Sequence, residues 1–337
     1  MALQWMRNPD RSVTADEPRW WSDLHADVTV TASGYNSTNG WTASSVDGYG
    51  IKYPRVVTDP TGFADGCRIK LSGTPAAEKV VLAKVDDLGA IQCCVTITTA
   101  RKLRIYRGNI ATALTAASDD ALAIGTWYKL GFRGLVDHVA GEAEVYVDGD
   151  AVLAVNGVDT AEETTAVWRG VYVGFSSDWI IGHLYVLDGS GAFTALRKGA
   201  FVVALESTAT GSHAQYTPSG AATLHEAVDD TDPDDDTTHI KAAAIPLPKY
   251  SLVMATLADT PVVYGVQETA MVKNSVAGLN YANLAVVNGT TYVDGWQSAD
   301  TAAWRALQTL WAANPNTGLP WTVGQVNAAE FGGLLDA

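Results

Sequence analysis

Three carboxylates lie close together on one stretch of this chain, at Glu142, Glu144 and Asp148. Side chains two residues apart in a β-strand share a face, so a strand through this stretch would place all three together. Paired carboxylates carry out glycoside hydrolysis, one as acid and the other as nucleophile or base. The same spacing arises wherever a solvent-facing strand leads into an Asp-Gly turn, and the Glu-x-Asp-x-x-Glu spacing of glucanases is absent. We therefore expect no catalytic residue here and keep glycan hydrolysis as a remote alternative.

Other catalytic and nucleotide-binding signatures are absent from the sequence. There is no G-x-S-x-G nucleophile elbow, no G-x-x-x-x-G-K-[ST] loop and no G-x-G-x-x-G turn. No histidine pairs with a serine or cysteine in a recognised arrangement, and His183, inside an apolar run, is expected to be a packed or interface residue. The sequence predicts that the chain is not an enzyme and binds no cofactor. The six histidines are His25, His138, His183, His213, His225 and His239.

Metal binding is left open by the sequence. Hard cations such as Ca²⁺ prefer several carboxylate oxygens, and six aspartates fall between residues 229 and 236. This run lacks the EF-hand layout, so an exposed, solvated loop is the simpler interpretation. The three cysteines show no zinc-ligand spacing. Cys93 and Cys94 are expected to point to opposite faces of a strand, and a disulfide from Cys67 to either is allowed but not required. We expect buried or half-buried free thiols.

Aromatic residues offer the main alternative to a purely structural role. A sugar site would use ring faces in the loops at a sandwich rim, and the candidates are Trp41, Tyr49, Trp168 and Trp179. Tryptophan in all-β proteins more often fills a core or an interface, so both interpretations stay open. Three further tryptophans, Trp5, Trp20 and Trp21, lie in an irregular N-terminal arm, residues 1–25. This arm is expected to dock either on its own domain or on a neighbouring subunit.

Composition narrows the class of protein. The chain has 337 residues, of which 47% are hydrophobic and 18% charged, enough for two packed domains. A net charge of −15 argues against nucleic-acid binding and against attraction to anionic membranes. The N-terminus lacks the apolar core of a secretory signal, and no apolar run approaches the ~20 residues of a membrane helix. We expect the protein to stay in the cytosol where it is made, or to leave inside a particle.

The spacing of apolar runs predicts an all-β protein. From residue 27 onward, short alternating runs recur about every ten residues with turn residues between them, which is typical of a sandwich or barrel. The clearest unit is a hairpin turning at Asp148-Gly149, and Asn288-Gly289 gives a second such signal. Gly189-Ser190-Gly191 breaks the pattern. The predicted domains are 26–190 and 191–337, each a β-sandwich, the second being the smaller.

The C-terminal region contains one conflict. Ala303, Leu307, Leu310 and Trp311 stand at helical spacing, with Asp300 available as a cap, so the local pattern predicts a helix over residues 300–312. A strand over these residues stays the alternative. Further on, Thr322 is placed to cap a short helix ending near Asn327. A final strand is expected over residues 331–335.

Two groups of motifs resemble known proteins. GTWYKLGFRG and GEAEVYVDGDAVL resemble the laminin-G/concanavalin A-like jelly roll. The continuation, with GHLYVLDGSGAF, QYTPSG, DDTDPDDDTTHI and NPNTGLPWTVGQVNAAEFGGLL, resembles virion proteins of tailed bacteriophages, variously tail, fibre or head-associated proteins. The resemblance covers roughly residues 26–337. It implies an N-terminal jelly roll followed by a smaller sandwich, and it favours the strand over the helix at 300–312.

The same resemblance implies a function. The chain would be a non-enzymatic structural protein, a tail, fibre or capsid decoration, assembled in the host cytoplasm and carried in the virion. Its partners would be other virion proteins and itself, as a homo-oligomer, with a trimer the first expectation. The alternative is an adhesin module that binds a host-surface glycan. Laminin-G-like domains also hold Ca²⁺ at the sandwich rim, where the loop carboxylates of this chain are Asp59, Asp137 and Asp159.

Overall fold

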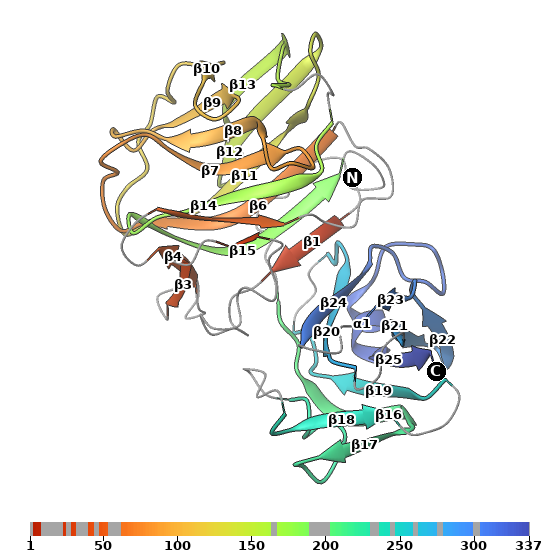
Figure 1. Ribbon diagram of the computed structural model, residues 1–337. Coiled ribbons are helices and arrows are strands. Elements are labelled where there is room, and N and C mark those ends of the chain that lie inside the picture. Colours follow the sequence, from red (N-terminus) through yellow and green to blue (C-terminus); the bar gives the residue numbers. More distant parts are fainter. Residues whose placement is uncertain are drawn as a thin grey trace. The chain divides into compact units, whose positions relative to one another are not determined.

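The computed structural model describes residues 3–7, 23–24, 28–31, 40–43, 47–52, 62–162, 167–188, 203–229, 236–242, 247–258, 262–274, 279–298 and 304–336. The chain divides into two compact units, Met1–Val203 and Ala204–Ala337. Both are built from strands, which confirms the all-β prediction (Figure 1). The expected boundary between residues 190 and 191 lies outside the described residues. Within them, no helix is long and apolar enough to cross a membrane.

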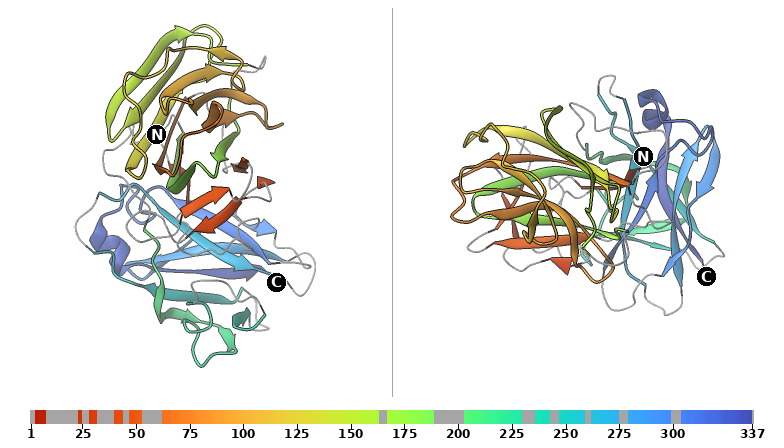
Figure 2. Two further views of the ribbon diagram at one scale, coloured as in Figure 1. Left: turned by 90° about the vertical axis from the view of Figure 1, so that its left-hand side faces the viewer. Right: turned by 90° about the horizontal axis from the view of Figure 1, so that it is seen from above.

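The first unit is a jelly-roll sandwich of two antiparallel sheets, here named sheet A and sheet B (Figure 2). Sheet A has the order β13 (Asp150–Val158), β12 (Gly141–Val147), β11 (Trp127–Leu135), β6 (Gly62–Leu71), β15 (Trp179–Asp188), β4 (Gly40–Ala43) and β3 (Val28–Thr31). Sheet B has the order β10 (Thr112–Ala113), β9 (Leu103–Arg107), β8 (Ile91–Ile97), β7 (Lys79–Val85), β14 (Gly170–Phe175), β5 (Gly48–Lys52) and β2 (Asp23–Leu24).

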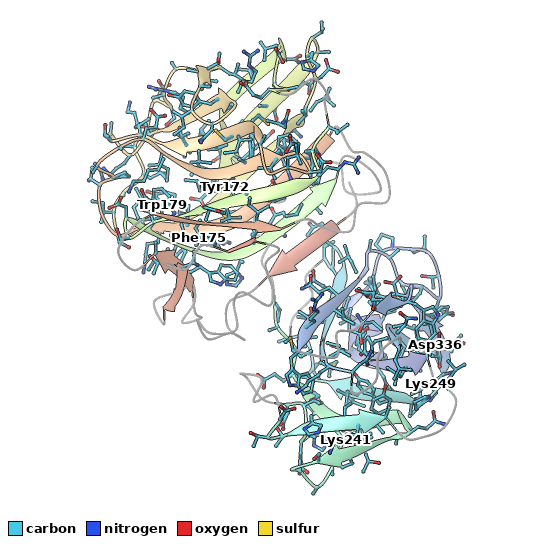
Figure 3. All side chains as sticks on the ribbon, viewed as in Figure 1. Tyr172, Phe175, Trp179, Lys241, Lys249 and Asp336 are labelled. Atoms are coloured by element: carbon cyan, nitrogen blue, oxygen red, sulfur yellow. The ribbon has the colours of Figure 1, made fainter. Side chains whose placement is uncertain are left out.

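Large aromatic side chains fill the space between the two sheets. Phe63 of β6 and Phe132 of β11 meet edge to face, with ring centroids 4.8 Å apart. Trp41 of β4 packs on Phe175 of β14 and so joins sheet A to sheet B. These four side chains are buried, and burial of large aromatic rings supplies much of the apolar area that stabilises a sandwich. Figure 3 shows Phe175 and Trp179 in this layer.

The predicted Asp-Gly hairpin is present between β12 and β13. Asp148 and Gly149 have φ angles of 52° and 93°, the positive values that a type I′ turn requires at both central positions. Ala143 and Val145 on β12 are fully buried, whereas Glu142 is exposed and Glu144, between them, is half-buried. The alternation that predicted a half-buried strand is therefore confirmed.

The N-terminal arm contributes a strand to its own unit. β1 (Leu3–Arg7) pairs with β15, and Trp5 lies opposite Val186 in the register. Trp20 and Trp21 lie outside the described residues. The three cysteines of this unit, Cys67, Cys93 and Cys94, are buried free thiols, as expected.

The second unit is the smaller sandwich. Its main sheet has the order β16 (Ser207–Ala214), β19 (Lys249–Met254), β25 (Glu330–Asp336), β21 (Asn280–Val287) and β22 (Thr290–Val293), and β23 (Gln297–Ser298) also pairs with β21. Two ribbons accompany it, β17 (Tyr216–Ser219) with β18 (His239–Ala242), and β20 (Val266–Val272) with β24 (Arg305–Trp311). Asn288 and Gly289, with φ of 52° and 75°, form the second predicted hairpin turn, between β21 and β22.

The helix predicted over residues 300–312 is wrong, because its described part, Arg305–Trp311, is strand β24. Leu307, Thr309 and Trp311 are buried and alternate with half-buried neighbours. The pairing with β20, in full register from Val266 to Val272, overrides the local helical spacing. The predicted cap is confirmed: Thr322 and Gln325 form a capping box at the start of α1 (Val323–Ala328), and β25 follows as expected.

Candidate functional site

An open groove of about 610 Å³ lies on the first unit. Strands β5, β8 and β14 of sheet B contribute to its wall, together with the turn between β7 and β8 and the turn between β9 and β10. The described residues that line it are Tyr49, Ile51, Leu88, Gly89, Ala90, Ile91, Asn109, Ala111, Glu162 and Tyr172. The lining combines aromatic and aliphatic side chains with the polar groups of Asn109 and Glu162.

Two stacked tyrosines form the aromatic part of the groove. The rings of Tyr49 and Tyr172 lie 5.5 Å apart between centroids, at an interplanar angle of 18°. The register of β5 and β14 explains this contact, because Tyr49 lies opposite Gly174, which has no side chain to separate the rings. Val171 and Val173 point into the sandwich core with no exposed surface, so Tyr172 between them points to the outer face of sheet B (Figure 3).

The groove has an apolar floor beside the tyrosines. Val80, Ala83, Cys94 and Tyr106 form a buried cluster, against which Ile91 and Tyr172 pack. Burial raises the pKa of Tyr172 to about 12, with the neighbouring Tyr49 as a smaller cause. The Tyr172 phenol is therefore neutral at physiological pH and able to donate a hydrogen bond. At the rim, Leu88 is 89% exposed and presents an unshielded aliphatic side chain.

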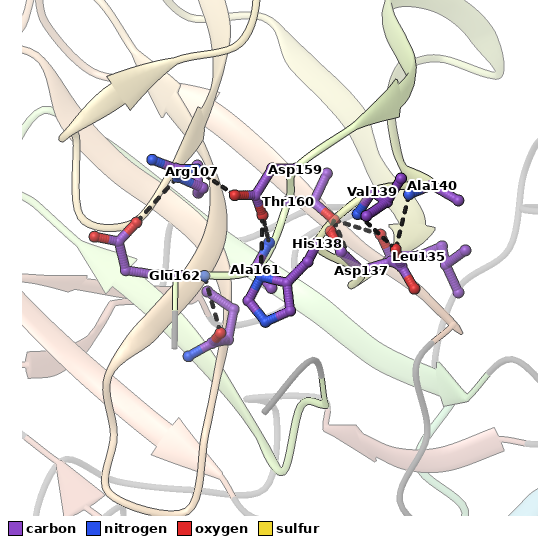
Figure 4. Close-up of polar contacts among 11 residues, drawn as sticks. Arg107, Leu135, Asp137, His138, Val139, Ala140, Asp159, Thr160, Ala161 and Glu162 are labelled. Atoms are coloured by element: carbon purple, nitrogen blue, oxygen red, sulfur yellow. Dashed lines mark hydrogen bonds and ion pairs between the residues drawn. The ribbon is translucent and has the colours of Figure 1, made fainter. Parts of the chain in front are cut away.

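An ion-paired cluster adjoins the groove at Glu162 (Figure 4). Arg107 at the end of β9 bonds the Asp159 carboxylate through Nη1, and its Nε lies 3.2 Å from Glu162 Oε2. The Glu162 backbone N–H also donates to Oε1 of Gln92, at 3.1 Å. Glu162 thus belongs both to the groove lining and to a fixed network, which holds its position.

Two of the three loop carboxylates proposed as calcium ligands, Asp137 and Asp159, make contacts within the chain. Asp137 accepts hydrogen bonds from the backbone N–H groups of Val139 and Ala140, both at 2.7 Å, and these bonds lower the pKa of Asp137 (Figure 4). Asp159 is bound to Arg107. In the part of the chain that the structure describes, no group of three or more His, Cys, Asp or Glu side chains is arranged to hold a metal ion.

The other candidate calcium ligands lie mostly outside the described residues. Asp59 is among these, as are the aspartates between residues 230 and 235. At the two ends of that run, Asp229 is exposed and Asp236 forms an ion pair with Lys273 at 3.1 Å. A calcium site stays a prediction.

The carboxylates that suggested hydrolysis have structural contacts. Glu144 bonds Arg133 Nε and the Tyr146 hydroxyl, and Arg133 lowers the pKa of Glu144. Asp148 Oδ1 accepts from the Lys129 backbone N–H at 2.9 Å and so fastens the hairpin turn. Glu142 is exposed.

Three of the four predicted sugar-binding aromatics belong to the core, which corrects that expectation. Trp41, Trp168 and Trp179 have no exposed surface, so their ring faces meet neighbouring side chains rather than a ligand. Trp168 Nε1 donates to the carbonyl oxygen of Gly62, and Trp179 Nε1 to that of Gly174, both at 3.0 Å. Tyr49 alone lies in the groove. Its partner Tyr172 was missed, although the alternation in Val171–Val173 placed it on the outer face.

Comparison with known proteins gives structural likeness only. No known protein family and no curated protein sequence matches the chain. Among solved structures, it is similar to a mutant of Trypanosoma rangeli sialidase displaying trans-sialidase activity, at 17% identity over 47% of this chain and 27% of that one, with a TM-score of 0.35. A structure titled sialidase matches at 9% identity over 56% and 18% of the chains, with a TM-score of 0.40.

A third similar structure is the native heptameric SAP-like pentraxin from Limulus polyphemus. It is 13% identical over 43% of this chain and 71% of that chain, with a TM-score of 0.33. The chain spans about a quarter of the length of the first sialidase structures it matches. Likenesses of this size carry no information about function.

Proposed function

We propose that this chain is a non-enzymatic structural protein of a tailed-bacteriophage particle, placed on the tail, in a fibre or on the capsid surface. The observation that carries the proposal is the C-terminal segment from Asn314 to Leu335, the most discriminating part of the sequence resemblance. Its turn, capped helix and strand are one continuous structural unit. β25 at its end lies between β19 and β21 in the main sheet of the second unit.

The way in which the charged groups are used supports a structural role. Several acidic side chains of the first unit form ion pairs with lysine or arginine, as in Lys84–Asp65, Lys79–Asp178 and Arg133–Glu144. These contacts connect strands and loops, so they stabilise the sandwich. The net charge of −15 favours solubility at high local concentration and disfavours nucleic acid or an anionic membrane as partner.

Quantitative mass spectrometry of gradient-purified particles tests this proposal. The particles would come from the host in which the gene is expressed, and the copy number would be normalised to the major capsid protein. We expect a fixed copy number that is the same from one preparation to the next. We also expect self-association, with threefold symmetry the first expectation from the resemblance. Absence from the particles, or a trace amount that varies between preparations, would reject the proposal.

A second candidate function, glycan recognition, is favoured by the groove. Sugar rings stack on flat aromatic faces and hydrogen-bond to amides and carboxylates, and the groove combines Tyr49 and Tyr172 with Asn109 and Glu162. Because Glu162 and the strongly acidic chain repel anions, the expected ligand is a neutral saccharide. Hydrolysis is disfavoured, since Glu162 is the only carboxylate among the described lining residues and glycosidases use two.

Retention on immobilised host-surface polysaccharide tests this second function. Tyr172→Ala should weaken retention. Tyr146→Ala is the control and should not, because Tyr146 belongs to β12 of sheet A and does not line the groove. Both variants would first be checked for native circular dichroism. Equal retention of the two variants, or no retention of the unmodified chain on any neutral polysaccharide, would exclude the groove as a glycan site.

A further inference from the structure

A lysine and an aspartate meet between the two sheets of the first unit. Lys84 belongs to β7 of sheet B and Asp65 to β6 of sheet A, and Nζ lies 2.8 Å from Oδ1. Neither side chain has any exposed surface. Because a carboxyl C–O bond is about 1.2 Å long, Nζ lies within about 4 Å of the carboxyl carbon. An amine held this close to a carboxyl carbon is near the distance at which the two groups react.

Apolar side chains surround this contact. The residues that lie opposite Asp65 or Lys84 in the strand register have no exposed surface, and they are Phe132, Val186, Val171 and Cys93. The Lys84 ammonium also lies 5.0 Å from the centroid of the Phe63 ring and 3.8 Å from that of the Trp168 ring. Such surroundings solvate neither charge as water does, so they favour any neutral form that the two groups can reach.

The carboxyl group of Asp65 is poorly stabilised in its charged form. Its Oδ2 is buried and accepts no hydrogen bond from the part of the chain that the structure describes. Burial raises the pKa of Asp65 to about 6, although Lys84 lowers it in part. A proton that passes from Lys84 to Asp65 leaves an amine beside a carboxylic acid and removes both charges from the core. The amine is a nucleophile, and the acid can lose water.

We propose that Lys84 and Asp65 condense in the folded protein to an intramolecular amide, a covalent link between sheet A and sheet B. Nζ passes one proton to Oδ1 along the existing hydrogen bond and then attacks Cγ. The Nζ–Cγ bond forms, a second proton moves from Nζ to Oδ1, and the Cγ–Oδ1 bond breaks. Oδ1 leaves as water, and Oδ2 becomes the amide oxygen. One ammonium and one carboxylate thus give one amide and one water, with no further reactant.

A second ion pair of the same unit shows why burial matters for this step. Lys79 Nζ lies 2.6 Å from Asp178 Oδ2, but the two side chains are 18% and 21% exposed. Lys79 Nζ also contacts Asp47 and Ser176, which hold it as an ammonium. Water reaches this pair and stabilises its charges, so it should remain an ion pair. At Lys84 and Asp65, the absence of exposed surface also protects an amide from hydrolysis.

The cross-link would connect two consecutive strands that lie in opposite sheets. β6 and β7 follow each other in the chain, and the amide would close a ring over residues 65–84. Sheet A and sheet B could then not separate at this point without breaking a covalent bond. This inference does not depend on the proposed virion role.

The intact mass of the denatured and reduced full chain tests the proposal. We expect most molecules to be lighter than the sequence mass by one water molecule. A tryptic digest locates the link, because an amide at Lys84 blocks cleavage after this residue. Residues 56–68 and 80–101 should therefore appear as one branched peptide, in which tandem mass spectrometry places the bond between Asp65 and Lys84. Cleavage after Lys79 should be normal.

The variant Lys84→Arg is the control for the chemistry. Arginine keeps the positive charge beside Asp65, but its guanidinium is not deprotonated in proteins and cannot attack. This variant should have the full sequence mass. It also distinguishes the amide from a cyclic imide at Asp65-Gly66, which loses one water without any need for Lys84. Lys79→Arg is the matched variant and should lose one water, as the unmodified chain does.

The unmodified chain decides the outcome even if Lys84→Arg does not fold. A full sequence mass, or normal tryptic cleavage after Lys84, would overturn the proposal. A loss of water that persists in Lys84→Arg would do so as well, because the bond would then lie elsewhere.

Discussion

Lys84 of β7 and Asp65 of β6 form an ion pair inside the first sandwich, with Nζ and Oδ1 2.8 Å apart and neither side chain exposed. The pair connects sheet A to sheet B. Lys84 Nζ also lies 3.8 Å from the centroid of the Trp168 ring, a cation–π contact that stabilises the ammonium group. Burial raises the pKa of Asp65 to about 6, although Lys84 lowers it in part. Because both groups are desolvated, each charge is stable in the core only while the other is present.

Replacing one member of the Lys84–Asp65 pair should therefore lower the free energy of unfolding more than replacing both members. Asp65→Ala leaves an uncompensated buried ammonium and should lower the free energy of unfolding by about 3–5 kcal/mol. The double variant Lys84→Met with Asp65→Leu should recover most of this loss, because it replaces the pair with apolar side chains. Urea denaturation of the three proteins gives the comparison. If the double variant is no more stable than Asp65→Ala, the pair is not coupled as described.

Glu268 should make the second unit less stable as pH rises. Burial raises the pKa of Glu268 well above 4.5, with the Asp294 charge as a further cause, and Trp311 Nε1 donates to its carboxyl at 3.3 Å. Above pH 4.5 the unfolded chain releases this proton while the folded unit retains it, so the free energy of unfolding falls with rising pH. Glu268→Gln mimics the protonated form. It should stabilise the protein at about pH 7 and have little effect at about pH 4.

Chemical denaturation at the two pH values measures this difference. Glu142→Gln is the control, since Glu142 is an exposed glutamate of the other unit. An equal effect of Glu268→Gln at both pH values would contradict the assignment of a retained proton.

Gly333 in β25 should not tolerate a side chain. A Cβ on Gly333 would lie 2.0 Å from the Tyr281 hydroxyl oxygen, which itself lies 2.8 Å from the hydroxyl oxygen of Tyr250. Gly333→Ala should destabilise the protein by about 1–3 kcal/mol through overpacking. Gly324→Ala in α1 is the matched control, because nothing lies within 4 Å of its Cβ, and it should be neutral or stabilising. Thermal denaturation measures both, and equal effects would refute the packing argument.

The three thiols should be unreactive in the folded protein. Burial raises the pKa of Cys67, of Cys93 and of Cys94, that of Cys94 to about 12, and the reactive thiolate is therefore scarce. An aromatic disulfide reagent should label no thiol in the native state and three in denaturant. Rapid native labelling of any of them would show that the sandwich opens or that the thiol lies at the surface.

Local turn chemistry explains what the sequence predicted well. The Asp148-Gly149 and Asn288-Gly289 turns need positive φ at both central residues, which these residue pairs supply, and Thr322 caps a helix through contacts within three residues. Such features depend on neighbours in sequence, so they can be inferred without the fold.

Features that depend on residues distant in sequence were predicted less well. β24 was predicted as a helix because Leu307, Leu310 and Trp311 stand at helical spacing, and the pairing with β20 that makes it a strand involves residues distant in sequence. The ring of Trp179 is buried and that of Tyr172 lines a groove, yet both are aromatic residues in strands, and which face each strand turns to the core depends on the facing sheet. Asp65 and Lys84 lie on different sheets, so no spacing in the sequence indicates their contact.

Cryo-electron microscopy of intact purified particles tests the central claim most directly, namely that this chain acts by packing into an assembly. The account predicts density at defined, symmetry-related positions on the tail, fibre or capsid surface into which the two sandwich units fit. Particles whose reconstruction is complete without this chain, together with a purified protein that hydrolyses a glycan, would contradict it.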